Sequence, residues 1–269
     1  MNKINKILLV FLVVLLISGC SSVVLTNRTQ LNLIPRETIL NMSFDQHNLF
    51  LEENTVSSDP SEVEMVKRVG IKIQHSVENY FSEQNLSKQL KDYDWEFDLV
   101  VNSEPNAWCM PGGKVVVYTG ILSITNNENG LAVVMGHEVA HSIARHGNER
   151  MSQTLIAQLG GIALYQALEE RPEETQQFWM SAYGLGAQAG LILPYSRLHE
   201  SEADRLGLIF MAMAGYDPNG AVNFWQRMGE HKSGASPPEF LSTHPSDKTR
   251  IEKIESHLPE AMAYYVREN

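Results

Sequence analysis

Basic residues are scarce in this sequence of 269 residues. Lysine and arginine number 21 against 32 aspartates and glutamates, and no basic run follows the first few residues. Affinity for nucleic acid comes largely from lysine and arginine contacts with the phosphate backbone. The formal charge of −11 therefore argues against a nucleic-acid partner.

Cysteines and long apolar runs are also few: the chain has 2 cysteines. The apolar run Ile7–Ile17 follows two lysines and is too short for a permanent membrane span. It leads into Ile17-Ser-Gly-Cys20, which resembles the lipobox of bacterial lipoproteins. We therefore expect residues 1–19 to be a signal peptide that is removed before a lipidated Cys20. Cys109 would then have no partner for an intramolecular disulfide.

The residues after Cys20 predict where the protein is held. Ser21 stands where retention in the inner membrane would favour aspartate, so the lipoprotein resemblance implies an outer-membrane anchor on the periplasmic face. Because the chain is acidic, attachment must come from acyl chains rather than from attraction to anionic lipid. Residues 20–38 are expected to form a tether, which leaves 39–269 as a single catalytic domain.

One apolar stretch carries the candidate chemistry. From Leu131 to Ala144 the ionisable side chains are His137, Glu138 and His141 alone. A helix over this stretch would bury all three, and buried ionisable groups need a compensating partner. Histidines four residues apart lie on one helix face, where a single zinc ion can reach both. Glu138 then lies beside the metal and can take a proton from the attacking water.

A catalytic zinc site usually has three protein ligands, so a further donor is needed downstream. The metzincin spacing fails, because Ala144 and Gly147 replace its glycine and its third histidine. Glu200 and Asp204 are four apart on one face of a predicted helix. Glu200 can bind the metal while Asp204 accepts a hydrogen bond from a ligand histidine. A solvated acidic face is the alternative, and Glu202 is expected to be an ordinary surface acid.

The remaining patterns predict an α+β fold that is mostly helical. Trp95–Val101 alternates in polarity and Lys114–Thr119 is rich in β-branched residues, with Pro111–Gly113 between them. We expect a small sheet ending in a hairpin immediately before the histidine helix. An edge strand there could pair with an extended substrate, and Asn106 and Ala107 are the candidate residues of that edge.

Helical patterns lie on both sides of this sheet. Asp59-Pro60 reads as a cap and first residue of a long amphipathic helix. After the histidine helix, we expect helices over about 150–170 and 173–192, then over Arg197–Ala214, and a last amphipathic helix after Pro245. The first two are too short or too polar to span a membrane, and are expected within the folded domain.

Five motifs, in order, resemble a known family. They are Asn106-Ala-Trp-Cys-Met-Pro-Gly-Gly113, Tyr118-Thr-Gly120, His137-Glu-Val-Ala-His141, Ser196-Arg-Leu-His-Glu-Ser-Glu-Ala-Asp204 and Thr243-His-Pro-Ser246. Together they resemble the gluzincin metallopeptidases grouped with HtpX and the CAAX prenyl protease, and within them the soluble periplasmic branch of BepA and LoiP. The resemblance covers about residues 60–258. It implies a zincin-like metallopeptidase domain with one zinc ion per chain, and makes Glu200 rather than Glu202 the third ligand.

The resemblance also implies a function. It is peptide-bond hydrolysis by a lipid-anchored zinc endopeptidase of the periplasm, acting on unfolded or misassembled envelope proteins. His244 is placed near the metal, either as a donor to the oxyanion or as a fourth ligand that excludes water. Arg250 is expected to support His244. The alternatives are a chaperone or adaptor for envelope assembly whose zinc is latent and mainly structural, and a surface lipoprotein without a metal.

Overall fold

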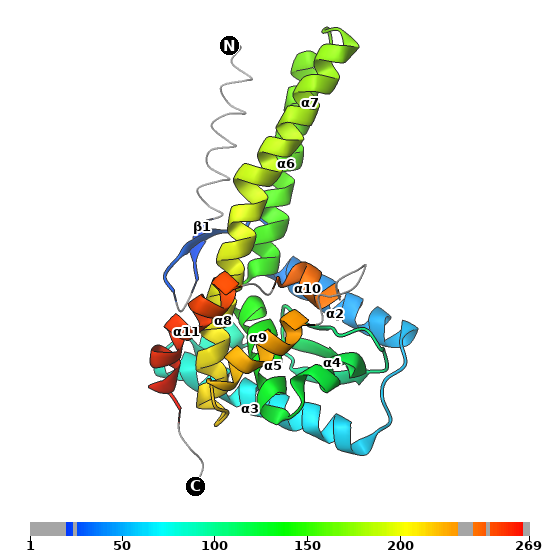
Figure 1. The fold of residues 1–269 in the computed structure, drawn as a ribbon. Coiled ribbons are helices and arrows are strands. Elements are labelled where there is room, and N and C mark those ends of the chain that lie inside the picture. Colours follow the sequence, from blue (N-terminus) through cyan, green and yellow to red (C-terminus); the bar gives the residue numbers. More distant parts are fainter. Residues whose placement is uncertain (1–19, 24–25, 231–238, 246–247, 266–269) are drawn as a thin grey trace. The chain divides into compact units, whose positions relative to one another are not determined.

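The computed structural model describes residues 20–23, 26–230, 239–245 and 248–265 (Figure 1). Contacts within the chain divide it into two compact units. The smaller unit comprises Met1–Ile39 and Arg145–His199, and the larger unit comprises Leu40–Ala144 and Glu200–Asn269. The predicted signal peptide lies outside the described residues.

A three-stranded sheet forms one layer of the larger unit, with strand order β3-β5-β4. The central strand, β5 (Lys114–Tyr118), pairs parallel with β3 (Glu96–Val100) and antiparallel with β4 (Ala107–Met110). The predicted hairpin is present, but its first strand is β4, whereas β3 lies on the other side of β5. Gly112 and Gly113 make the turn at φ angles of 90° and 89°, which glycine adopts without strain.

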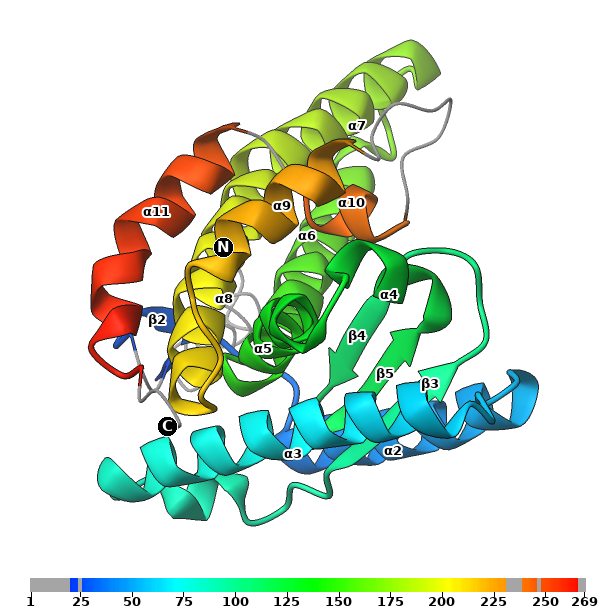
Figure 2. The same ribbon diagram turned by 60° about the horizontal axis from the view of Figure 1, so that its bottom comes forward.

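The histidine helix, α5 (Glu128–Ile143), lies at the centre of the larger unit. Each residue from Gly130 to Ala140 is buried, as predicted for a helix that is apolar on nearly every face. The helix packs against β4, against α3 (Pro60–Glu83) and against α9 (Gly220–Glu230) (Figure 2). Its first turn is capped by Asn127, whose side-chain oxygen accepts a hydrogen bond from the Gly130 amide at 2.9 Å.

Several further elements complete the larger unit. They are α2 (Arg36–Glu53), which begins in the smaller unit, a 3-10 helix (Ser87–Leu90), α4 (Thr119–Thr125), α10 (Glu239–Thr243) and α11 (Lys248–Met262). The predicted cap of α3 is confirmed, because Asp59 accepts hydrogen bonds from the amides of Ser61 and Glu62. The prediction of a mostly helical α+β fold with a small sheet is confirmed as well.

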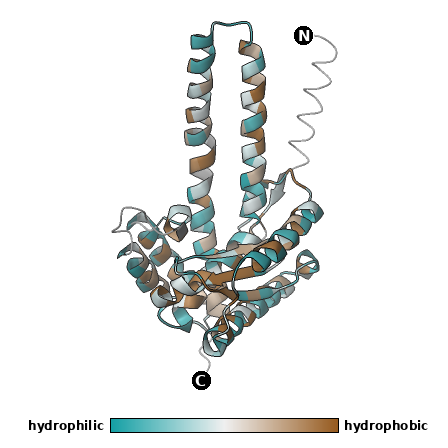
Figure 3. Cartoon of the chain, turned by 90° about the vertical axis from the view of Figure 1, so that its right-hand side faces the viewer, coloured by the Kyte–Doolittle hydropathy of each residue, from teal (hydrophilic) through white to brown (hydrophobic). Residues whose placement is uncertain are grey.

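Two long helices, α6 (His146–Leu168) and α7 (Glu173–Ala187), form a hairpin in the smaller unit (Figure 3). The Tyr183 hydroxyl donates to the Ala157 carbonyl at 2.8 Å, and a Cβ at Gly160 would lie 2.2 Å from that hydroxyl. Glycine therefore makes room for the tyrosine. A π-helical stretch (Gln188–Ile192) leads into α8 (Leu193–Met213), whose residues from Glu200 belong to the larger unit. Among the described residues, no helix combines the length and the hydropathy that a membrane crossing requires.

Part of the segment expected to be a tether is folded. β1 (Cys20–Ser22) pairs antiparallel with β2 (Thr29–Leu31). Arg28 donates to both carboxylate oxygens of Glu149 in α6, at 3.0 and 2.8 Å, and the Leu33 amide donates to the Ser152 hydroxyl at 2.9 Å. Residues 20–38 were expected to form a tether, and the contacts of Arg28 and Leu33 with α6 join residues more than a hundred positions apart, which no local pattern predicts. The role of this segment as a tether stays a prediction.

Candidate metal centre

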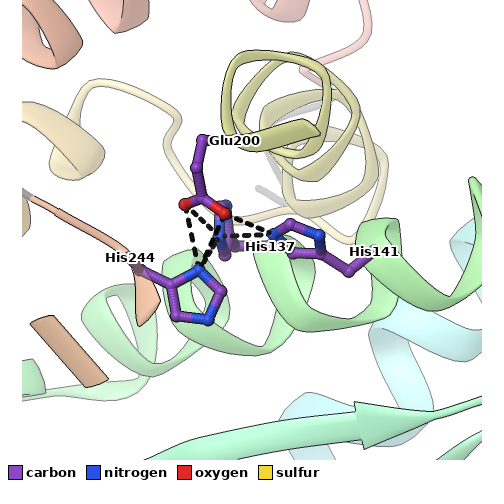
Figure 4. A group of neighbouring side chains, drawn as sticks. All are labelled: His137, His141, Glu200 and His244. Carbon is purple, nitrogen blue, oxygen red and sulfur yellow. Dashed lines mark hydrogen bonds and ion pairs between the residues drawn. The ribbon is translucent and has the colours of Figure 1, made fainter. Parts of the chain in front are cut away.

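Four side chains of the larger unit converge on one point: His137, His141, Glu200 and His244 (Figure 4). One donor atom from each lies within 4.8 Å of every other. Two come from successive turns of α5, one from α8, and one from the residue after α10. The structure thus brings together the three predicted ligands and the predicted fourth residue.

The donor atoms of neighbouring side chains in this group lie 2.9 to 3.2 Å apart. His137 Nε2 lies 3.0 Å from His141 Nε2 and 3.2 Å from His244 Nδ1. Glu200 Oε1 lies 3.2 Å from His141 Nε2, and its Oε2 lies 2.9 Å from His244 Nδ1. Ligands on one tetrahedral zinc ion are separated by similar distances, because each lies about 2.0–2.3 Å from the metal.

A pair of glycines allows α8 to approach α5 this closely. A Cβ at Gly207 would lie 2.8 Å from the backbone nitrogen of His137, and one at Gly136 would lie 2.9 Å from the Gly207 carbonyl oxygen. Both distances are shorter than an ordinary van der Waals contact, so neither position accommodates a side chain without movement of the backbone. Glu200 lies two turns before Gly207 in the same helix. The glycine pair therefore sets the distance between Glu200 and the histidines.

Asp204 and Arg250 lie behind the donor group. Asp204 Oδ1 is 2.9 Å from His137 Nδ1, so the His137 ring can present Nε2 to a metal. Arg250 donates to both oxygens of Asp204, at 2.9 and 2.8 Å, and its Nη1 lies 3.2 Å from Glu200. Arg250 therefore contacts the carboxylates, whereas the sequence had suggested support for His244.

The electrostatic environment stabilises charge on these groups. Burial opposes ionisation of His137, but hydrogen bonds with Asp204 and Glu200 outweigh it and raise its pKa to about 9. Burial also opposes ionisation of Glu200, but the neighbouring His141 and His244 lower the pKa of its carboxyl well below the usual range. In the metal-free protein the donor set therefore contains an anionic Glu200 and a protonated His137, and binding of a metal would release that proton.

Glu138 is buried next to the donor group. Burial raises the pKa of its carboxyl, which favours proton transfer at neutral pH. Its Oε1 lies 3.4 Å from His244 Nε2 and has no hydrogen-bond partner in the described part of the chain. A buried carboxylate oxygen without a partner costs free energy unless something outside the chain satisfies it. Water held at a metal is one such partner, so this orphaned atom and the donor set both fit a catalytic zinc ion.

Sequence reasoning missed Trp225, which lies in α9. Its ring stacks under the Arg250 guanidinium, 3.4 Å from the ring centroid, and meets the His137 ring edge-on with centroids 5.7 Å apart. Its contact with Arg250 joins segments far apart in sequence, so no local pattern predicts it.

Three other residues considered in the sequence analysis lie outside the group of four donors. Asn106 precedes β4 and Ala107 begins it; both are buried, and β4 is an edge strand that packs against α5. Their assignment to substrate binding stays a prediction. Glu202 is also buried, so the expectation of a surface acid was wrong, because the periodicity of one helix does not reveal what covers its other faces.

Comparisons with known proteins point in the same direction. Residues 71–258 match peptidase family M48. The chain is 41% identical over 174 residues to mitochondrial metalloendopeptidase OMA1 of Schizosaccharomyces pombe, which is 64% of this chain and 49% of that protein. It is 31% identical over 182 residues to the human protein of that name, 64% of this chain and 34% of that protein. It is 33% identical over 165 residues to the beta-barrel assembly-enhancing protease of Yersinia pestis, 58% of this chain and 33% of that protein.

The chain spans about half or less of the length of these curated relatives. The matches confirm the predicted family resemblance and a zincin-like domain that uses zinc. The names of the relatives also agree with the predicted class of enzyme, a metalloendopeptidase.

Proposed function

The chain belongs to peptidase family M48, and we propose that it is a zinc-dependent endopeptidase. From the sequence that ends at Cys20, we further propose that it is anchored by lipid in the bacterial envelope. The observation that carries the catalytic part of the proposal is the convergence of His137, His141 and Glu200 beside the buried carboxyl of Glu138. Two imidazoles and a carboxylate form the donor set of many zinc peptidases, and a general base lies beside them.

His137, His141 and Glu200 would hold the metal. Bound zinc supplies Lewis-acid polarisation of water and of the scissile carbonyl. Glu138 takes the proton of the attacking water and returns it to the leaving amine, and its raised pKa suits both steps. Asp204 holds the His137 ring in the tautomer that presents Nε2.

His244 can act in two ways in this site. Its Nδ1 lies within the donor group, 2.9 Å from Glu200 Oε2, and its Nε2 faces Glu138. If the ring coordinated the metal from this position, it would take the place of water, which favours a latent resting state. When a substrate displaces the ring, the same imidazole is close enough to donate to the oxyanion.

The cellular part of the proposal rests on the sequence before the folded region. The signal-like run ending at Cys20 supports a lipid anchor at the periplasmic face of the outer membrane. The beta-barrel assembly-enhancing proteases are bacterial, and their name supports substrates among unfolded or misassembled envelope proteins. The OMA1 relatives are mitochondrial, so their names do not support a bacterial envelope location. The proposed compartment therefore rests on the N-terminal sequence of this chain.

The second candidate function is a chaperone or adaptor for envelope assembly. The position of His244 in the donor group favours it, because a metal held by four side chains is structural rather than catalytic. Such a protein would bind assembly intermediates without cutting them.

A Glu138→Gln variant tests the proposal. It removes the general base but no metal ligand, so zinc content should be unchanged while cleavage of unfolded casein falls by about 10²–10⁴-fold. Glu104→Gln is the matched control, because that exposed side chain lies outside the donor group. Cleavage at the wild-type rate by Glu138→Gln would refute the mechanism. His244→Ala distinguishes the two functions: cleavage rises or falls if His244 acts in a peptidase, and stays absent in an adaptor.

A further inference from the structure

A second group of potential metal ligands lies in the larger unit, on elements other than those that carry the four donors of the candidate metal centre. It consists of His47 from α2 with Glu96 and Asp98 from β3. One donor atom from each lies within 4.8 Å of the others. Acidic side chains often gather without binding a cation, so the case depends on how the imidazole is placed.

The alternation of β3 explains how the carboxylates meet the imidazole. Glu96 and Asp98 are two residues apart, so they share one face of the strand. Phe97, between them, points to the other face, where it fills the space beside Gly70 of α3. The face with the two carboxylates is covered by α2, which contributes His47.

His47 is fully buried, and its two nitrogens have different surroundings. Its Nε2 lies 3.1 Å from Asp98 Oδ2. Its Nδ1 has no hydrogen-bond partner in the described part of the chain, and the nearest carboxylate oxygen, Glu96 Oε2, is 3.9 Å away. That separation is too long for a hydrogen bond, but two ligands on one metal ion can be that far apart. A buried nitrogen without a partner costs free energy, so an external partner for it is expected.

The charge balance leaves room for a divalent cation. Lys114 is the nearby cation that pairs with these carboxylates: its ammonium contacts Asp94 at 2.7 Å and also Oε1 of Glu96. The other oxygen of Glu96 faces His47. Lys67 exerts a weaker attraction on Asp98, whose pKa is raised by burial. Asp94, Glu96 and Asp98 together carry more negative charge than Lys114 neutralises.

We propose that His47 Nδ1 and Glu96 form a second metal site that binds a divalent transition ion such as Zn²⁺, with Asp98 accepting a hydrogen bond from His47 Nε2 and so leaving Nδ1 free for the ion. An imidazole with a carboxylate suits zinc or manganese rather than calcium or magnesium, which prefer oxygen ligands alone. The side chains of Glu96 and Asp98 are 44% and 21% exposed, so water can complete the coordination. The ion would join α2 to the sheet, and it would stabilise the fold without taking part in peptide hydrolysis.

Counting bound zinc in the full mature chain tests the proposal. Equilibrium dialysis followed by elemental analysis should give two equivalents of Zn²⁺ for the wild type. His47→Gln should bind one, because glutamine can still donate to Asp98 but lacks the imidazole nitrogen. His141→Ala should also bind one, and the double variant none. His75→Ala, which removes an exposed imidazole of α3, is the control and should retain two.

Thermal unfolding gives a second readout. Zn²⁺ should raise the midpoint temperature of unfolding of the His141→Ala variant. This rise should disappear in the His47→Gln, His141→Ala double variant. Glu96→Gln, at a partly exposed side chain, should weaken the second equivalent without affecting folding. A wild type that stops at one equivalent, or a folded His47→Gln that retains two, would overturn the proposal and show that His47 and Asp98 form only a hydrogen-bonded pair. Neither result depends on the cleavage assay, so the proposed peptidase activity is tested separately.

Discussion

Replacing Gly207 with alanine should damage the metal centre without touching any ligand. The new Cβ would lie 2.8 Å from the His137 nitrogen and 2.9 Å from the Gly136 carbonyl carbon. Backbone atoms at an ordinary contact distance of about 3.5 Å would require α5 and α8 to separate by roughly 0.7 Å. Neither neighbour is the end of a flexible side chain, so the strain cannot be relieved by rotation.

The expected cost follows from that displacement. Overpacking of this kind destabilises a protein by about 1–3 kcal/mol, which in a chain of this size lowers the melting temperature by several degrees. Moving Glu200 away from the histidines should also weaken zinc binding, and a displacement approaching 1 Å can lower the cleavage rate by about 10²-fold. Differential scanning calorimetry and competition with a chelator would measure the two effects.

Gly184→Ala is the matched control for this prediction. Gly184 lies within α7, and a Cβ there would meet nothing within 4 Å. Alanine favours a helix over glycine by about 0.5–1 kcal/mol, so this variant should be as stable as the wild type or more so. If Gly207→Ala keeps wild-type stability and zinc affinity, the close contact of the two helices does not position Glu200, and the reasoning fails.

Two further predictions concern the charges around His137. Asp204→Asn should lower zinc affinity by about 10–100-fold in a chelator competition, because the carboxylate that orients His137 is lost; unchanged affinity would show that the ring needs no such partner. In the metal-free protein, the folded state raises the pKa of His137 from 6.5 to about 9, so the charged ring contributes fully below pH 6.5 and its contribution is lost as the pH rises through 9. The free energy of unfolding should therefore fall by up to about 3 kcal/mol over this interval in denaturant titrations, whereas an Asp204→Asn protein should show a smaller fall.

The sequence was most informative where chemistry and local periodicity coincide. His137, Glu138 and His141 lie on one apolar helix, and their spacing alone predicts both the burial and the shared face that the structure shows. Asp59 before Pro60 likewise predicts the start of α3, because the cap and its partners are adjacent in sequence. The spacing of Glu200 and Asp204 favoured Glu200 as the third ligand, and the family resemblance supported that choice over Glu202.

The strand order shows why other features escaped prediction. The turn at Gly112 and Gly113 is local, and the hairpin that it makes was expected. The parallel pairing of β3 with β5 joins strands that are not adjacent in the chain. The position of β4 at the other edge of β5 depends on its packing against α5.

By itself, the sequence determined the elements whose signals lie within a few residues: the buried histidine helix, the capped helices, the glycine turn and the pair of imidazoles that a metal can bridge. The tertiary structure decided which distant groups meet them. It places Arg250 on Asp204, Trp225 under Arg250, and His47 against two carboxylates of β3. Such contacts depend on how closely backbones can approach, as at Gly136 and Gly207, and that distance is set by packing over the whole unit rather than by any local pattern.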